Sequence, residues 1–389
     1  MARSAVAGEE ARAEVDALLA EVALGIARER GLDQSAALGP LRAPAERSRG
    51  ATPEERGLVG ELVALARTEG ADGALGAVHE AGLDAVDLSS GRAGQSRRRA
   101  GAHFTPRSLS SSVVARALEA LGAPRAERAE VCDPALGGGA FLCEALRQLA
   151  GPLSTPGERR RVAQRLAGID RDPRAVEVAR LALWLEVGDT SMPLDEAGRL
   201  HVGDALLEDG ASFVEGSPPS RARPWSQLLL GGAARAAGGF DLVLGNPPFL
   251  GGKRLRTVHG DAYAEALVRL HPGTSKNVDL AAHFLLSAYD ALAEGGVVGF
   301  VVTNTIAQGA TRRGGLALLV ERGASIVAAE RRVPWPGVAG VVVSTVHLQR
   351  GAPRSTPVLD GAAVASIDSF LSAARRGLRA VSYTHLTLP

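Results

Sequence analysis

Cysteine, lysine and long apolar runs are all scarce in this sequence of 389 residues. Its two cysteines, Cys132 and Cys143, are too few for a disulfide scaffold or for a zinc site built on cysteines. No run of about 18 apolar residues occurs, so no membrane-spanning helix is predicted. The first residues carry acids and lack the apolar core of a signal peptide. These absences favour a globular protein of the reducing cytoplasm.

Positive and negative charges are nearly balanced. The chain has 44 basic and 43 acidic residues, which gives a net charge of +1. This balance excludes a uniformly basic, histone-like protein but leaves room for a local basic cleft. Only two of the basic residues are lysines, Lys253 and Lys276, so residues 1–252 contain no lysine.

Two patterns divide the chain. Residues 1–95 carry apolar residues at three- and four-residue spacing, which predicts a small helical region, and a polar, basic linker follows at 91–101. Beyond it, short apolar runs alternate with helical patterns, which predicts an α/β domain with a mostly parallel sheet and helices on both faces. The predicted strands lie at 129–133, 166–170, 200–204, 240–245, 297–303, 324–330 and 340–348. Residues 205–239 and 250–278 interrupt the alternation and are predicted to be insertions, either functional loops or disordered segments.

The first predicted strand runs into a glycine-rich turn, DPALGGGAF at 133–141. Glycines let a backbone turn tightly and approach a ligand, and the next helix points its positive end at the turn. Ligands of open α/β sheets bind at the carboxyl ends of the strands, so Asp133, Gly137 and Gly139 are candidates for binding a nucleotide-type ligand. The turn is not a GxxxxGK[ST] phosphate loop, which would need a lysine. An ordinary strand-to-helix turn explains this segment alone equally well.

Acids also follow the next two predicted strands. Asp170 suits a ribose diol, because a carboxylate can accept two hydroxyl protons. Asp172 precedes Pro173 and is assigned as the N-cap of the following helix. Asp204 precedes Ala205 at the end of the third strand, where a carboxylate can accept from the amine of an adenine. Taken alone, Asp204 is no more distinctive than a surface acid.

The tetrapeptide Asn246-Pro247-Pro248-Phe249 follows the apolar strand 240–245. Two prolines make a stiff turn with fixed dihedral angles and leave backbone carbonyls free to accept hydrogen bonds. Asn246 adds a side-chain carbonyl, and Phe249 offers a flat face for stacking. Two neutral acceptors beside a stacking surface suit a planar amine, whose lone pair returns to nitrogen when both hydrogens are held. A plain strand-ending turn is the alternative, and the three upstream acids disfavour it.

Together these segments resemble the amino-group DNA methyltransferases that use S-adenosylmethionine. Within them the chain is most similar to the adenine-N6 group with NPPF or NPPY, found in the modification parts of single-chain restriction–modification proteins. Further segments match in family order: GAHFTP at 101–106, GIDRDP at 168–173, GDA at 203–205, Asp279-Leu280 with Phe284, and GGVVGFVVTNT at 295–305. Upstream, LGAVHE at 75–80 resembles the L-G-x-x-Y-E helix of that family's connector. Arg171 departs from the family, which often has an apolar residue against the cofactor adenine.

The resemblance implies a Rossmann-like class I methyltransferase fold with S-adenosylmethionine as its cofactor. It implies that Thr105 and Pro106 contact the methionine end, that Asp133, Gly137 and Gly139 cradle the amino acid part, that Asp170 binds the ribose, and that Asp204 and Ala205 bind the adenine. Catalysis would fall to Asn246, Pro247, Pro248 and Phe249, which hold and stack the N6 amine of an adenine flipped out of DNA. Methyl transfer would be direct, with no covalent enzyme intermediate.

The implied partner is double-stranded DNA, with a separate restriction or specificity component as a further partner, no metal and no membrane. Lys253, Arg254 and Arg256 follow the NPPF turn and are candidate DNA phosphate contacts, as is the cluster at 97–99. A solvated loop explains either cluster equally well. The same NPPF chemistry on a protein glutamine or an RNA base is the alternative function. No nuclease activity is expected, because metal-dependent nucleases of the usual type need a catalytic lysine near their acids.

The end of the sequence differs in style from the rest. Residues 381–389, VSYTHLTLP, follow an Arg- and Ala-rich segment and look like translated adapter DNA, and a natural frayed terminus is the alternative. We therefore predict a helical connector at 1–95, a catalytic domain at 96–352, the start of a truncated C-terminal part at 353–380, and a non-native tail. A target-recognition domain usually follows the catalytic domain in this group, and the remaining residues are too few for one.

Overall fold

The computed structural model describes residues 2–32, 36–38, 53–89, 105–207, 238–336 and 341–373. The predicted linker at 91–101, the basic cluster at 97–99 and the tail at 381–389 lie outside these ranges, as does most of the predicted insertion at 205–239. Within them, no helix combines the length and apolar character needed to cross a membrane.

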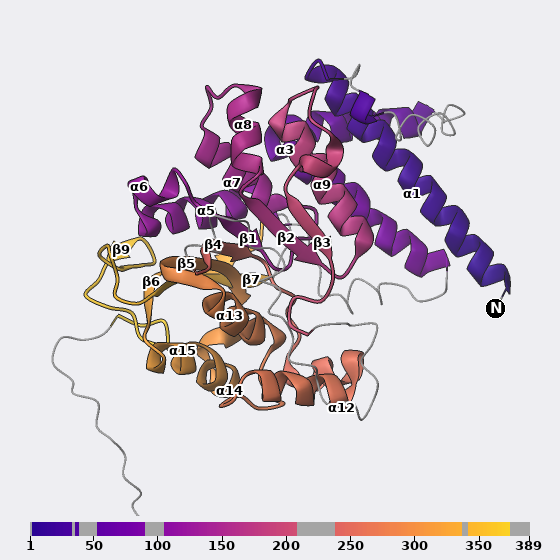
Figure 1. Ribbon diagram of the computed structural model, residues 1–389. Coiled ribbons are helices and arrows are strands. Elements are labelled where there is room, and N and C mark those ends of the chain that lie inside the picture. Colours follow the sequence, from indigo (N-terminus) through magenta and orange to yellow (C-terminus); the bar gives the residue numbers. More distant parts are fainter. Residues whose placement is uncertain are drawn as a thin grey trace, which may run out of the picture.

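A single sheet forms the centre of the molecule (Figure 1). Its strands are β1 (Val131–Asp133), β2 (Leu166–Asp170), β3 (Arg199–Val202), β4 (Phe240–Gly245), β5 (Leu292–Thr303), β6 (Ala324–Pro334), β7 (Val342–Arg350), β8 (Val358–Leu359) and β9 (Ala362–Ala363). They lie in the order β3-β2-β1-β4-β5-β7-β6-β8-β9. Strands β3 to β5 run parallel, whereas β7 is antiparallel to both β5 and β6. The chain order therefore reverses beside β1, which places the ends of β1 and β4 at the switch point of the sheet.

Helices cover both faces, as predicted. One face carries α5 (Arg107–Leu121), α6 (Ala123–Ala126), α7 (Ala140–Ala150), α8 (Pro156–Ala163) and α9 (Pro173–Val187), and the other carries α12 (Gly252–Leu270), α13 (Leu280–Asp290), α14 (Gly309–Arg312) and α15 (Leu318–Glu321) (Figure 1). Short helical turns also lie between the longer elements of the chain: η1 (Ala36–Leu38), η3 (Leu194–Glu196), η4 (Asn304–Ala307) and η5 (Arg313–Ala317). This confirms the predicted Rossmann-like α/β fold.

Alternation along the strands explains why both faces need helices. On β1, Val131 joins the hydrophobic cluster under α5, α7 and α9, whereas its neighbour Cys132 joins the cluster under α12 and α13. On β4, Leu242 and Leu244 face the first cluster and Val243 the second. Successive side chains of a strand point to opposite faces, so a strand that is apolar throughout must be covered twice.

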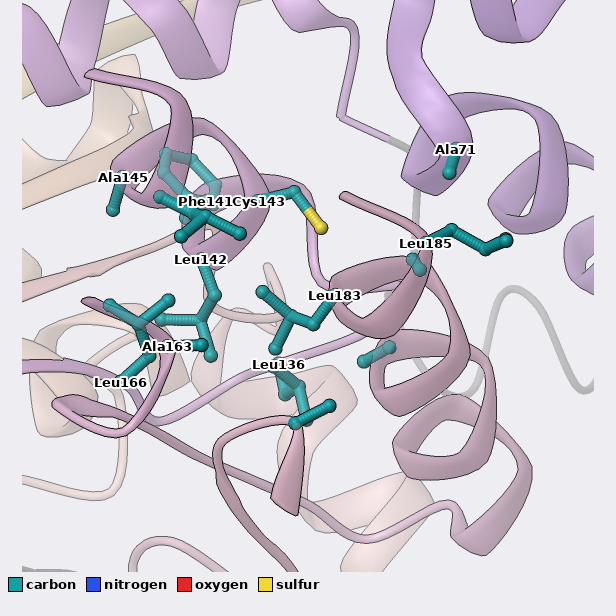
Figure 2. Packing of buried hydrophobic residues seen from close by; sticks show 14 of the residues in the cluster. Ala71, Leu136, Phe141, Leu142, Cys143, Ala145, Ala163, Leu166, Leu183 and Leu185 are labelled. Atoms are coloured by element: carbon teal, nitrogen blue, oxygen red, sulfur yellow. The ribbon is translucent and has the colours of Figure 1, made fainter. Parts of the chain in front are cut away.

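The helical N-terminal region is confirmed as well. It consists of α1 (Ala2–Glu29) and α3 (Pro53–Ser89), which pack against each other and against α9. Figure 2 shows Ala71 of α3 in the same buried cluster as Phe141 and Cys143 of α7 and Leu183 and Leu185 of α9. This region therefore shares a hydrophobic core with the α/β domain, which gives α3 a fixed place beside α7 and α9.

The predicted loop at 250–278 is wrong, because most of this segment is the helix α12. Its buried Leu255, Tyr263 and Leu267 join the hydrophobic cluster that also contains residues of α13, while charged residues cover the other side. Gly260 interrupts the helix at φ +83°, which hides its periodicity from a sequence pattern. At the other end of the chain, β8 and β9 extend the sheet, with β8 parallel to β6. The division of the chain into domains stays a prediction.

Candidate active site

The sharpest predicted residues converge at the carboxyl edge of the sheet. Asp133 ends β1, Asp170 ends β2, and Asn246 follows Gly245 at the end of β4. These three strands are neighbours, because β1 pairs with β2 on one side and with β4 on the other. Residues 133, 170 and 246, far apart in the sequence, therefore meet at one edge.

Asp133 is fully buried, and only one of its carboxylate oxygens has a partner. Its Oδ1 accepts the backbone N–H of Ala135 at 2.9 Å, while its Oδ2 is buried without a hydrogen bond. Burial raises the pKa of this carboxyl to about 8, and the nearby charge of Asp170 adds to the shift. A Cβ on Gly245 would lie 2.8 Å from Asp133 Oδ1, so β4 has to end in glycine here. The free Oδ2 is an acceptor that a ligand cation can satisfy.

The glycine turn after β1 takes a conformation that its glycines permit. Gly137 and Gly139 have φ values of +50° and +88°, in the left-handed region that disfavours other residues. A Cβ on Gly139 would lie 3.0 Å from the Cβ of Ala179, so the turn also packs closely on α9. Both glycines are therefore required by the backbone, and the turn stays open to a ligand.

Asp170 binds the glycine turn in this structure. Its Oδ2 accepts the N–H of Gly137 at 2.9 Å, and its Oδ1 accepts the N–H of Asp172 at 2.9 Å. Burial raises the pKa of Asp170 above its usual value. Each carboxylate oxygen has a second acceptor position, so these bonds leave capacity for hydroxyl groups. The predicted N-cap is confirmed, because Asp172 Oδ1 accepts the N–H of Arg174 at 2.9 Å at the start of α9.

The side-chain amide of Asn246 is oriented by Thr105, which lies just before α5. Its Nδ2 donates to Oγ1 of the buried Thr105 at 3.2 Å, just before α5. With its nitrogen used in this way, the amide presents Oδ1 as its other atom, and this oxygen is buried without a partner. The resemblance predicts that Thr105 contacts the cofactor, and the structure adds its hydrogen bond to the Asn246 amide. Pro106 lies beside it as the residue preceding α5.

Apolar packing and a backbone hydrogen bond fix the rest of the NPPF turn and the residue after it. Phe249, after Pro247 and Pro248, is half-buried and packs against the hydrophobic clusters of both sheet faces. Leu250 accepts the N–H of Leu280 at 2.9 Å through its carbonyl. Asp279 caps α13 by accepting the N–H of Ala281 at 2.9 Å. The segment at 279–280 matched a family motif without an assigned role, and here it anchors the turn.

Both carboxylate oxygens of Asp204, which is predicted to bind adenine, already have partners within the protein. Its Oδ1 accepts the N–H groups of Leu206 and Leu207 at 2.8 and 3.2 Å, and its Oδ2 accepts the Tyr263 hydroxyl at 3.1 Å. The guanidinium of Arg171 lies 3.7 Å from the same Oδ2. Ala205 is buried beside it. Sequence reasoning missed Tyr263, because the helix that carries it was predicted as a loop.

The basic cluster lies at the start of α12, next to the NPPF turn. Lys253, Arg254 and Arg256 are exposed, whereas Leu255 between them is buried. The cluster is therefore exposed to solvent a few residues after the NPPF turn, and its contact with DNA stays a prediction.

The residues present fit S-adenosylmethionine on the chemistry of their donors and acceptors. The buried Oδ2 of Asp133, which has no partner, suits the ammonium group of the cofactor. The glycines of the turn let the protein backbone come close to that ligand. The half-used carboxylate of Asp170 suits hydroxyl groups. At Asp204, the tyrosine and arginine crowd the position expected to bind adenine.

A known protein family and several solved structures resemble this chain. The family described as "MmeI, DNA-methyltransferase domain" matches residues 110–358, more than half of the chain. No curated protein matches the sequence. Among solved structures, the chain is similar to the Type IIL restriction-modification enzyme MmeI in complex with DNA, with 19% identity, a TM-score of 0.51, and coverage of 77% of this chain and 47% of that one. It is also similar to the type IIG restriction endonuclease BpuSI, with 13% identity, a TM-score of 0.52, and coverage of 91% and 39%.

These structural likenesses establish the fold, and this chain spans less than half the length of either enzyme. The family match covers β1 to β7 and with them the glycine turn, both strand-end acids and the NPPF turn. On that match, the chain belongs to the family of MmeI DNA-methyltransferase domains.

Proposed function

We propose that this protein transfers a methyl group from S-adenosylmethionine to the N6 amine of an adenine flipped out of double-stranded DNA. The observation that carries the proposal is the amide of Asn246, whose nitrogen is tied to Thr105 and whose oxygen is buried without a partner. An oriented neutral acceptor at the end of β4 suits the hydrogen of an amine. The family match supports DNA as the substrate.

S-adenosylmethionine, when bound, supplies an activated methyl group. Thr105, Pro106, Asp133, Gly137 and Gly139 would hold its amino acid part. Asp170 would hold its ribose, and Asp204 with Ala205 its adenine. The assignments of Asp133 and Asp170 are supported by the buried free oxygen of Asp133 and by the remaining acceptor positions of Asp170.

The chain's own part in the reaction is to bind and orient the amine. Asn246 Oδ1 and the backbone carbonyl of Pro247 would accept its two hydrogens, which returns the nitrogen lone pair toward the methyl donor. Pro248 keeps the turn stiff, and Phe249 stacks on the base. On accepting the methyl group that S-adenosylmethionine would supply, the amine nitrogen would release one proton to solvent.

DNA would be held outside this pocket by Lys253, Arg254 and Arg256, which are exposed beside the turn. Arginine and lysine contacts to phosphates position a duplex without reading its sequence. We further propose that the protein acts in the bacterial cytoplasm within a restriction–modification system, together with a restriction or specificity component.

Methyl transfer from labelled S-adenosylmethionine tests the proposal directly. Duplex DNA of mixed sequence, ribosomal RNA and a release-factor protein are offered in parallel, and labelled DNA is digested to nucleosides. The expected product is N6-methyladenine from DNA alone. Label found only in protein glutamine or only in RNA would replace DNA as the substrate.

Two variants separate catalysis from cofactor binding in the same assay. Asn246→Ala should abolish transfer while leaving the affinity for S-adenosylhomocysteine within about threefold, because the lost acceptor contacts the target amine. Asp170→Ala should mainly weaken that affinity. Near-normal turnover by Asn246→Ala would show that the proposed mechanism is wrong.

A further inference from the structure

The helix α3 lies directly behind the glycine turn, although it belongs to the N-terminal helical region. A Cβ on Gly138 would lie 3.3 Å from the Cα of Gly76 and 3.8 Å from the carbonyl oxygen of Asp72. The turn and the helix therefore approach each other with glycine on both sides. Gly76 lies in the segment LGAVHE at 75–80, to which no role has been assigned.

One side chain of this helix reaches the acids at the end of β2. His79 is buried, and its Nε2 lies 3.3 Å from Asp172 Oδ2. The backbone N–H of Asp172 in turn donates to Asp170 Oδ1, and the N–H of Gly137 donates to Asp170 Oδ2. A continuous series of contacts thus runs from α3 through both acids into the glycine turn.

A buried ionic cluster fixes α3 in this position. Arg147 of α7 binds Asp72 and also contacts Glu186 of α9 at 2.8 Å. Glu186 accepts the backbone N–H of Ala71 at 3.0 Å. Gly70, at φ +84°, kinks the helix just before these residues, and a side chain there would collide with the Arg147 guanidinium. The segment 71–79 is therefore held rigidly against α7 and α9.

We propose that His79 is a positioning residue for the cofactor, and that residues 71–79 of α3 form the outer layer of the cofactor site. This inference rests on the proposed use of S-adenosylmethionine. His79 holds the free oxygen of the Asp172 carboxylate, whose other oxygen caps α9. Without this contact, the 170–172 turn loses one of its fixed points, and the orientation of Asp170 toward the ribose is less tightly constrained.

Calorimetric binding of S-adenosylhomocysteine to the full chain tests this role. His79→Leu removes the contact and should weaken binding by about tenfold, because binding must then restore the order that the 170–172 turn has lost. His79→Gln keeps an N–H donor at a similar reach and should restore most of the affinity. With methyl transfer as a second readout, His79→Leu should raise KM for S-adenosylmethionine and leave kcat at saturation unchanged.

Asp16→Asn provides a matched control. Asp16 of α1 pairs with Arg174 of α9 at 2.9 Å, so it also ties the helical region to α9 but does not contact Asp172. This variant should bind S-adenosylhomocysteine like the wild type, and thermal melts show whether each variant is folded.

The outcomes are distinct. If the wild-type protein binds no S-adenosylhomocysteine, the proposed function itself is refuted. Wild-type binding with equal affinity in His79→Leu would overturn the positioning role alone. Equal losses in His79→Leu, His79→Gln and Asp16→Asn would also overturn it, since they would reflect loosened docking of the helices.

Discussion

Ionisation of Asp133 gives the most quantitative test of the site. Burial raises the pKa of this carboxyl to about 8 in the ligand-free protein. At pH 7 about nine-tenths of the molecules therefore carry it protonated. An ammonium group that binds its free Oδ2 favours the ionised form, so ligand binding should release about 0.9 proton at pH 7. The ionised fraction of Asp133 rises about ninefold from pH 6 to pH 7, so the apparent Kd for the ligand should fall about ninefold over this range.

The assay is titration calorimetry with S-adenosylhomocysteine in buffers of different ionisation enthalpy, which counts the protons released. Measurements stay below about pH 7.5, because an α-amino group itself titrates near 8. Asp133→Asn cannot ionise, so its binding should be weaker at pH 7.5, nearly independent of pH and without proton release. No proton release by the wild type at pH 7 would refute the contact between Asp133 and the ammonium group.

The same shift has a consequence for stability. A carboxyl whose pKa is higher in the folded than in the unfolded protein stabilises the fold fully below the unfolded pKa, near 3.8. That contribution is lost as the pH rises through the folded pKa of about 8. The ligand-free protein should therefore lose stability across this window, and Asp133→Asn should lose less.

Two further predictions concern the amide and the buried ionic cluster. Thr105→Val should lower kcat by about tenfold, because it leaves the Asn246 N–H without its acceptor and frees the amide to turn; Thr105→Ser should keep most of the activity, and single-turnover transfer measures both. Arg147→Met should lower the free energy of unfolding by about 3–5 kcal/mol in urea titrations, since it leaves the buried Asp72 without its cation. Arg67→Met breaks a solvent-exposed pair with Glu29 and should lower the free energy of unfolding far less than Arg147→Met; equal losses in both variants would contradict the argument.

The parts of the fold that local chemistry determines could be predicted from the sequence. The strand β2 lies at the predicted residues 166–170, and β4 at 240–245. Both are buried on two faces, so they stand out as short apolar runs that end in Asp170 or Gly245. The cap at Asp172 could also be predicted, because the capping bond joins residues two positions apart.

Contacts between distant elements could not be predicted. The Tyr263 hydroxyl reaches Asp204 across 59 positions, from a helix whose periodicity Gly260 interrupts. Likewise, the contact of His79 with Asp172 depends on how α3 packs against α9. Motif spacing places residues within one element, whereas these contacts arise from the packing of two elements.

The two buried acceptors at this edge differ in charge, and the difference separates binding from catalysis. Asp133 offers a carboxylate oxygen, whose capacity to accept depends on pH, whereas Asn246 offers an amide oxygen that does not titrate. A carboxylate suits a cationic donor, and a neutral amide suits a neutral amine. Because we assign Asp133 to the ammonium group of the cofactor and Asn246 to the target amine, the ionisation of Asp133 should change the affinity for the cofactor. The rate of methyl transfer at saturating cofactor should then stay nearly constant from pH 6 to pH 7.5, while the apparent Kd changes steeply.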